Sequence, residues 1–285
     1  MRNIKITVAY DGTDFRGWQI QPGQPTVQGA LLDVAEKLTC HRPMMYAAGR
    51  TDAGVHAMGQ VAHFKTPSDM SAGDFQRAFN ALLPASVRVL TAEEVGSDFH
   101  SRWDAKAKTY HYRIFRGRVV PPSLWRYIQH DPYPLDFEAM AEAARCFEGE
   151  HDFTSFAAST GSEEDDRERE MKRVIYGSEM LRSFQTNGAA SDEEWTYVIR
   201  GKSFLRYMVR KIAGTLIDVG RGRLKPGEIS KLFDLRDRSK SGPTLPPQGL
   251  WMMEVEYAGA EHNRHESMPT AAAVLDTRMS EESKI

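Results

Sequence analysis

Hydrophobic and polar positions in the first third of the chain follow two periods in a regular order. Residues 4–10 alternate between apolar and polar side chains, which is typical of a half-buried strand. Thr26 precedes an apolar series at helical spacing, which predicts an N-cap. The patterns predict strands at 4–10, 44–48, 60–66 and 87–95, and helices at 27–38 and 75–82. This β-α-β-β-α-β order is that of a ferredoxin-like unit.

The same order of elements returns later, without a visible sequence repeat. The patterns predict strands at 106–115, 172–181, 195–200 and 250–257, and helices at 137–147, 204–219 and 228–235. We expect an α+β fold of two ferredoxin-like units, residues 1–104 and 105–258, with mostly antiparallel sheets joined around a central catalytic cleft. Two polar segments lack apolar periodicity. We expect 161–170 to be a mobile segment or a lid over a substrate, and 259–285 a disordered tail.

Composition narrows the class of protein. The 285 residues are 41% hydrophobic and 27% charged, as in a soluble globular protein of one large or two medium domains. No apolar run approaches the roughly 20 residues of a membrane span, and the first residues lack the apolar core of a signal peptide. Cys40 and Cys146 form neither a disulfide framework nor a zinc motif. We therefore expect a cytoplasmic protein without membrane contact, metal or disulfide.

Charge is segregated although the formal net charge is only −2. The stretch 102–118 holds six basic residues against one acidic residue, and 202–225 holds seven against one. Such stretches form a phosphate-binding face or, alternatively, two solvated basic faces. The candidates for phosphate contacts are Arg102, Lys106, Arg116, Arg206, Lys211, Arg221 and Arg223. Binding through such contacts weakens steeply with salt.

The strongest candidate for chemistry is the segment 49–57, Gly-Arg-Thr-Asp-Ala-Gly-Val-His-Ala. It places the Asp52 carboxylate beside Arg50 in a loop between two predicted strands, and glycines on both sides let a ligand approach closely. On spacing alone, a tight turn with a surface Asp–Arg pair is the favoured interpretation of this segment.

Further motifs, in a fixed order, change that balance. The chain resembles the TruA-type transfer RNA pseudouridine synthases over residues 1–257, with its most specific match at 49–57. The supporting matches are Tyr10-Asp11-Gly12-Thr13, Phe15-Arg16-Gly17-Trp18-Gln19, Lys108-Thr109-Tyr110-His111-Tyr112, His151-Asp152-Phe153, Phe204-Leu205-Arg206-Tyr207-Met208-Val209-Arg210 and Pro246-Pro247-Gln248-Gly249-Leu250.

The resemblance implies an isomerase that converts uridine to pseudouridine at positions 38, 39 and 40 of the transfer RNA anticodon stem-loop. It implies no cofactor and a homodimer. Asp52 matches the catalytic aspartate, and Arg210, on the basic helix 204–219, matches the arginine that pairs with it. Arg50 matches the residue that displaces or holds the target nucleotide, and Tyr110 matches the tyrosine that packs against its base. The other strand tyrosine, Tyr112, is expected to be structural.

The chemistry explains why a carboxylate is needed. Asp52 acts as a nucleophile at C1′ of the ribose or at C6 of the base, or as a base at C2′, and the sequence leaves all three open. In each case Asp52 must be ionised, and we expect a nearby guanidinium to keep its pKa low. A base inside a helix must also leave the stack before its sugar is attacked. We expect His56 to be structural.

Two other classes of function remain open from the residues. One is a non-catalytic RNA-binding protein of two ferredoxin-like units, although the chain lacks the aromatic string that such RNA binders show. The other is a metal-dependent hydrolase that uses Asp52 and His56, for which the number of metal ligands is low.

Overall fold

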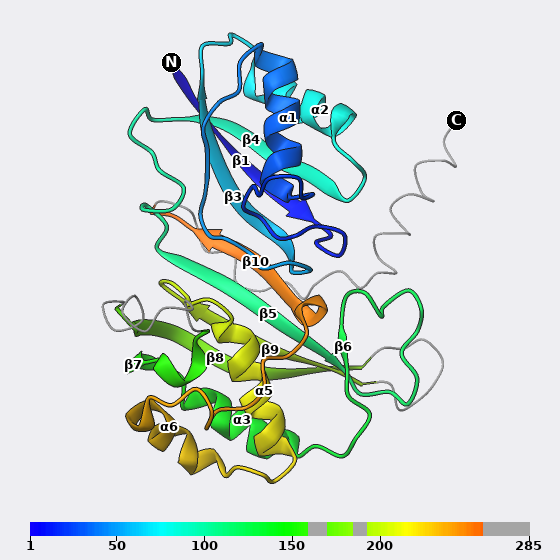
Figure 1. The fold of residues 1–285 in the computed structure, drawn as a ribbon, viewed down its shortest axis with the longest axis vertical. Coiled ribbons are helices and arrows are strands. Elements are labelled where there is room, and N and C mark those ends of the chain that lie inside the picture. The colour runs from blue at the N-terminus through cyan, green and yellow to red at the C-terminus, as the bar shows by residue number, and fades with distance from the viewer. Residues whose placement is uncertain (159–169, 185–192, 259–285) are drawn as a thin grey trace.

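The computed structural model describes residues 1–158, 170–184 and 193–258. Ten strands in these residues form one sheet in the order β4-β1-β3-β10-β5-β9-β8-β7, with β2 beside β3 and β6 beside β5 (Figure 1). The strands are β1 (Arg2–Tyr10), β2 (Met45–Ala47), β3 (His56–Thr66), β4 (Val87–Val95), β5 (Ala107–Phe115), β6 (Gln129–His130), β7 (Gly149–Asp152), β8 (Lys172–Phe184), β9 (Glu193–Gly201) and β10 (Leu250–Glu256).

The helices cover the sheet in two groups. In Figure 1, α1 and α2 lie over the strands of the first half, and α3, α5 and α6 lie over those of the second. None of the helices in the described ranges is long and apolar enough to cross a membrane. The helices are α1 (Val27–Thr39), α2 (Ala72–Leu82), α3 (Phe137–Arg145), α5 (Met208–Gly220) and α6 (Ile229–Leu235), with short 3₁₀ turns η1 (Thr154–Phe156), η2 (Pro226–Glu228) and η3 (Pro247–Gly249).

Local sequence accounts for the first elements. Along β1, Ile4, Ile6 and Val8 are fully buried while the residues between them are partly exposed, so the predicted alternation is confirmed. The Thr26 hydroxyl accepts a hydrogen bond of 3.2 Å from the backbone N–H of Gly29, which caps α1 as the pattern predicts.

One strand joins the two halves into a single sheet. β10 pairs in parallel with β3, through Trp251 with His56 and Met252 with Ala57, and pairs antiparallel with β5. The β5–β6 pair is also parallel, whereas the other pairs among the described strands are antiparallel. The expected α+β class with a mostly antiparallel sheet is thus confirmed. The junction at His56 places the preceding segment 49–55 at the middle of the sheet.

The predicted helix 204–219 is wrong at its start. α5 begins at Met208, because Tyr207 has a left-handed backbone with φ of +63°. The carbonyl of Arg206 instead accepts a 3.0 Å hydrogen bond from the backbone of Ala158. The segment 161–169 of the expected lid and the tail 259–285 lie outside the described residues.

Candidate active site

The backbone of the segment 49–54, the loop between β2 and β3, is fixed by three contacts. The hydroxyls of Tyr10 and Thr51 lie 2.8 Å apart inside the protein. The backbone N–H of Trp18 donates to the carbonyl of Thr51 at 3.0 Å. The side-chain amide of Gln60 on β3 donates to the carbonyl of Gly49 at 2.7 Å. The loop is therefore preorganised on the rigid strands β1 and β3.

Two glycines of the neighbouring motifs let this loop pack closely. Gly17 has φ of +91°, and a Cβ built on it would lie 2.6 Å from the carbonyl oxygen of Thr51. A Cβ on Gly12 would lie 2.0 Å from the carbonyl oxygen of Val55. Neither space admits a side chain. The segment 10–19 thus supports the loop that carries Asp52.

Asp52 meets Arg210, which comes from the other half of the sheet. Nη1 of Arg210, in the first turn of α5, lies 3.4 Å from Oδ2 of Asp52. Nε of the same guanidinium donates to the carbonyl of Leu245 at 2.7 Å. Its Cζ lies 4.9 Å from the ring centre of Tyr207, within range of a cation–π contact. The guanidinium is therefore held on three sides with one edge toward the carboxylate.

Burial determines the protonation of Asp52 more strongly than its ion pair does. Burial raises the pKa of Asp52 above its usual value of 3.8, and attraction by Arg210 and then Arg206 only partly offsets it. We expected a guanidinium to keep the pKa of Asp52 low. Arg210 does lower this pKa, but burial raises it by more, so the expected net direction is wrong. The Asp52 side chain is 25% exposed, so a substrate can still reach it.

The hydroxyl of Tyr110 on β5 lies close to Gly49, the first residue of the segment 49–54. A Cβ built on Gly49 would lie 3.7 Å from the Tyr110 hydroxyl, and the Tyr110 ring contacts Phe204 edge-on at 5.0 Å between centres. Burial, with smaller contributions from Tyr10 and Asp52, raises the pKa of Tyr110 well above its usual value. Tyr110 is thus a neutral phenol that donates a hydrogen bond or packs against a ring.

Tyr112 and Arg50, the other tyrosine and arginine of these motifs, form no hydrogen bond or ion pair with Asp52 in the described structure. Tyr112 is fully buried, and its hydroxyl donates to the carbonyl of Pro246 at 2.9 Å, a structural contact. Arg50 is exposed, and its guanidinium has no hydrogen bond or ion pair to the residues that the structure describes. The surface Asp52–Arg50 pair considered from spacing is therefore not formed.

His56 is fully buried and fully engaged. Its Nδ1 accepts from the backbone N–H of Gly12 at 3.1 Å, and its Nε2 lies 3.0 Å from the carbonyl of Arg126, so it donates there. The ring also stacks on Trp251 at 4.4 Å between centres. Burial lowers the pKa of His56 and keeps it neutral. With both nitrogens occupied, His56 has none free for the metal of a hydrolase. No group of three His, Cys, Asp or Glu side chains suited to a metal occurs within the described ranges.

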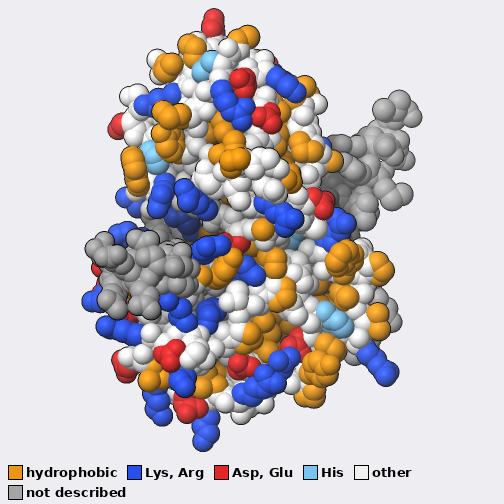
Figure 2. Space-filling view, in the orientation of Figure 1, with side chains coloured by type: hydrophobic (Ala, Val, Ile, Leu, Met, Phe, Trp, Pro, Cys, Tyr) orange, Lys and Arg blue, Asp and Glu red, His pale blue; other side chains and the backbone are white. Residues whose placement is uncertain are grey.

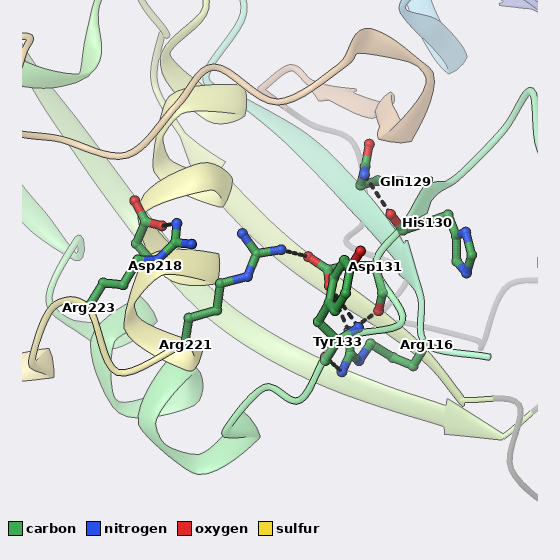
Figure 3. A network of polar contacts seen from close by, with 8 residues as sticks. All are labelled: Arg116, Gln129, His130, Asp131, Tyr133, Asp218, Arg221 and Arg223. Carbon is green, nitrogen blue, oxygen red and sulfur yellow. Dashed lines mark hydrogen bonds and ion pairs between the residues drawn. The ribbon is translucent and has the colours of Figure 1, made fainter. Parts of the chain in front are cut away.

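Four of the seven basic residues predicted to contact phosphate are engaged within the chain. Arg221 donates to Oδ2 of the buried Asp131 at 2.7 Å, and Arg116 donates to the backbone carbonyl of the same residue (Figure 3). Arg223 pairs with Asp218 at 3.0 Å. These contacts tie the segment that follows β5 to the end of α5.

Lys211 is the fourth engaged residue. Its ammonium donates to the carbonyl of Arg238 at 2.7 Å and to the Ser241 hydroxyl at 2.6 Å. Arg102, Lys106 and Arg206 are exposed and form no ion pair with the rest of the described chain. Figure 2 shows Lys and Arg side chains gathered across the middle of the face that carries the helices.

Sequence reasoning missed two supports of Arg210. The carbonyl of Leu245 leaves no signal in a sequence, because every residue type carries the same backbone oxygen. Tyr207 lies inside a quoted motif, yet its left-handed backbone was not expected, since a non-glycine residue rarely adopts positive φ.

Comparison with known proteins fits this geometry. The family model described as tRNA pseudouridine synthase matches residues 6–104 and 143–258. A protein of Solibacter usitatus named tRNA pseudouridine synthase A is 45% identical over 257 residues, which cover 90% of this chain and all of the relative. Relatives with the same name from Caldicellulosiruptor saccharolyticus, at 41%, and Brevibacillus brevis, at 41%, also cover 90% of this chain and all of their own length. The chain belongs to the tRNA pseudouridine synthase family.

Proposed function

We propose that this isomerase converts uridine to pseudouridine at positions 38, 39 and 40 of the transfer RNA anticodon stem-loop, with Asp52 as the catalytic carboxylate. The observation that carries the proposal is the Asp52–Arg210 ion pair, which unites the most specific motif with a helix of the other half. The family membership and the name of the relatives support the reaction.

The reaction moves one ribose from nitrogen to carbon of the same base. The N1–C1′ bond breaks, a C5–C1′ bond forms, the proton on C5 leaves and N1 takes up a proton. Redox balance is unchanged, so no oxidant or reductant is required. Asp52 assists as a nucleophile at C1′ or C6, or as a base at C2′. Arg210 holds the carboxylate in place and stabilises its ionised form.

Arg50 and Tyr110 are proposed to bind the target nucleotide. The exposed guanidinium of Arg50 is free to enter the space that the displaced base leaves in the stem. Tyr110 presents a buried ring and a neutral hydroxyl beside Gly49, which suits packing against a base. Because Tyr110 stays protonated, its role is contact rather than proton abstraction.

We further propose that each half is a ferredoxin-like unit, residues 1–104 and 105–258. The strand orders β4-β1-β3-β2 and β10-β5-β9-β8 support this reading, since both follow the order 4-1-3-2 of the element pattern β-α-β-β-α-β. Asp52 and Arg210 then come from different units, and neither unit alone is active.

A homodimer, with one RNA touching both subunits, completes the proposal. Four of the seven predicted phosphate contacts are engaged within the chain, so one copy offers a small basic face to RNA. A second copy enlarges that face. Light scattering of the purified protein should give twice the mass of the 285-residue chain.

Mapping the product tests the function. Transfer RNA with uridine at 38, 39 and 40 is incubated with the enzyme, treated with a carbodiimide that marks pseudouridine, and read by primer extension. We expect stops at these three positions and none with Asp52→Asn. Stops elsewhere would refute the substrate assignment. Tight RNA binding without any stop would favour the non-catalytic RNA-binding protein instead.

A further inference from the structure

A buried cation, Lys108, lies beside the active site. Lys108 on β5 is 7% exposed. A Cβ built on Gly49 would lie 3.6 Å from Cε of Lys108, against 3.7 Å from the Tyr110 hydroxyl. Lys108 and Tyr110 are two positions apart on one strand, so both side chains stand on the same face of the sheet. The end of Lys108 therefore lies under the segment that carries Arg50 and Asp52.

The ammonium of Lys108 lacks a counter-ion. No hydrogen bond or ion pair joins it to an acceptor in the parts of the chain that the structure describes. Asp52, the carboxylate of this site, pairs with Arg210, and Lys108 is not among the charges that act on it. A buried ammonium without an acceptor is costly, so such a group is paired with an anion or loses its proton more easily.

The charges around Lys108 favour an anion. The charged residue that acts on it is Arg102, on the loop between β4 and β5, which adds a second positive charge. Its neighbours on the adjacent strands, Val255 of β10 and Gly201 of β9, are uncharged. The described charges near the end of Lys108 are therefore positive.

We propose that Lys108, with Arg102, binds a backbone phosphate of the substrate RNA next to the displaced nucleotide. The inference rests on the proposed function, because the target must enter beside Asp52 for a flanking phosphate to reach Lys108. Phosphate contacts position RNA without reading its sequence, so Lys108 is a positioning residue and not a catalytic one. It holds the target sugar at the depth of the Asp52 carboxylate.

Protonation makes this contact sensitive to pH. Burial, and then Arg102, lowers the pKa of Lys108 to about 8. Tyr110 on the same strand stays protonated in this range. In the free enzyme the lysine therefore loses its charge above pH 8, and RNA affinity should fall there. An arginine at this position keeps its charge and removes the pH dependence.

The test measures binding of a fluorescent anticodon stem-loop by anisotropy, in an Asp52→Asn background so that the RNA is not converted. For Lys108→Met at pH 7 we expect affinity to fall about tenfold and the slope of log K against log salt to fall by about 0.7 to 0.9. Lys231→Met on the exposed face of α6 is the matched control and should change neither.

The remaining outcomes decide the interpretation. If Lys108→Met keeps both affinity and slope, Lys108 is a packing residue and the proposal is wrong. If it keeps both but loses turnover when Asp52 is restored, Lys108 acts in the chemistry, which also overturns the proposal. If Lys108→Met does not fold, Lys108→Arg decides, because it must retain affinity and show no loss between pH 7 and pH 9. If Lys108→Met shows the expected losses of affinity and salt slope but wild-type enzyme converts no uridine, the proposed function alone is refuted.

Discussion

The guanidinium of Arg210 lies 3.4 Å from the carboxylate of Asp52, 158 positions earlier in the chain. The pair is part of a geometry that neither half of the sheet makes alone. The segment 49–54 supplies the carboxylate, and the first turn of α5 supplies the guanidinium that donates to it. Nε of that guanidinium donates to the carbonyl of Leu245. The planar guanidinium of Arg210 donates to Leu245 and to Asp52 at the same time through two of its N–H groups, whereas the ammonium of a lysine has no such fixed pair of donors.

The pH dependence of catalysis should report this pair. Because burial raises the pKa of Asp52, the carboxyl requires a higher pH to ionise than a free aspartate does, and the acid limb of kcat/KM should lie above pH 3.8. Arg210→Gln removes the main attraction that opposes burial, so the limb should move further up. A stopped assay from pH 4 to pH 8 measures both. An unchanged limb in Arg210→Gln would show that the pair does not control ionisation.

Arg210→Lys separates charge from geometry. Lysine keeps a positive charge but cannot donate to Leu245 and Asp52 through a fixed fork. We expect kcat to fall by about 10²-fold, the order of magnitude for misplacing a group at the reacting centre. KM for transfer RNA should stay within a few-fold. Wild-type kcat in Arg210→Lys would show that charge alone is sufficient.

Gly17 should be intolerant of a side chain. Gly17→Ala places a Cβ 2.6 Å from the carbonyl oxygen of Thr51 at φ of +91°, so we expect a loss of about 2 kcal/mol or more in the free energy of unfolding, with lower activity. Gly23→Ala is the matched control, since Gly23 also has positive φ but no atom within 4 Å of the added Cβ. Urea unfolding compares them. Equal costs would show that the close contact with Thr51 is unimportant.

Lys108 should lower the free energy of unfolding at neutral pH. Its pKa falls from 10.5 to about 8 on folding, so the folded state disfavours the charged amine. Stability linked to this group is therefore lowest below pH 8 and rises as pH approaches 10.5. We expect Lys108→Met to gain about 3 kcal/mol at pH 7, at 1.4 kcal/mol for each pKa unit. The gain over wild type should shrink by pH 10, and a gain equal at both pH values would contradict the assignment.

The sequence predicts much of the local structure because local rules decide it. The alternation of Ile4, Ile6 and Val8 and the cap at Thr26 depend only on neighbours, and both are confirmed. The short strands β6 and β7 were missed, since two and four residues carry too little periodicity. The start of α5 was missed because a left-handed Tyr207 is set by packing around Arg210.

The candidate site depends on contacts between distant segments. The proximity of Asp52 and Arg210 came from family resemblance, since no local pattern relates residues of different halves. The net pKa shift of Asp52 was predicted in the wrong direction, because desolvation depends on every atom around a carboxyl and a sequence names only its partner. The buried position of Lys108 likewise follows from how β10 joins the two halves.

The most direct test of the central claim is tritium release from transfer RNA labelled at C5 of uridine, with wild type and Asp52→Asn compared. The asparagine side chain has nearly the same shape, so the variant should fold, and circular dichroism and thermal unfolding check that it does. The account predicts release by the wild type and at least about 10³-fold less by the folded variant. Release at the wild-type rate by folded Asp52→Asn would contradict the account.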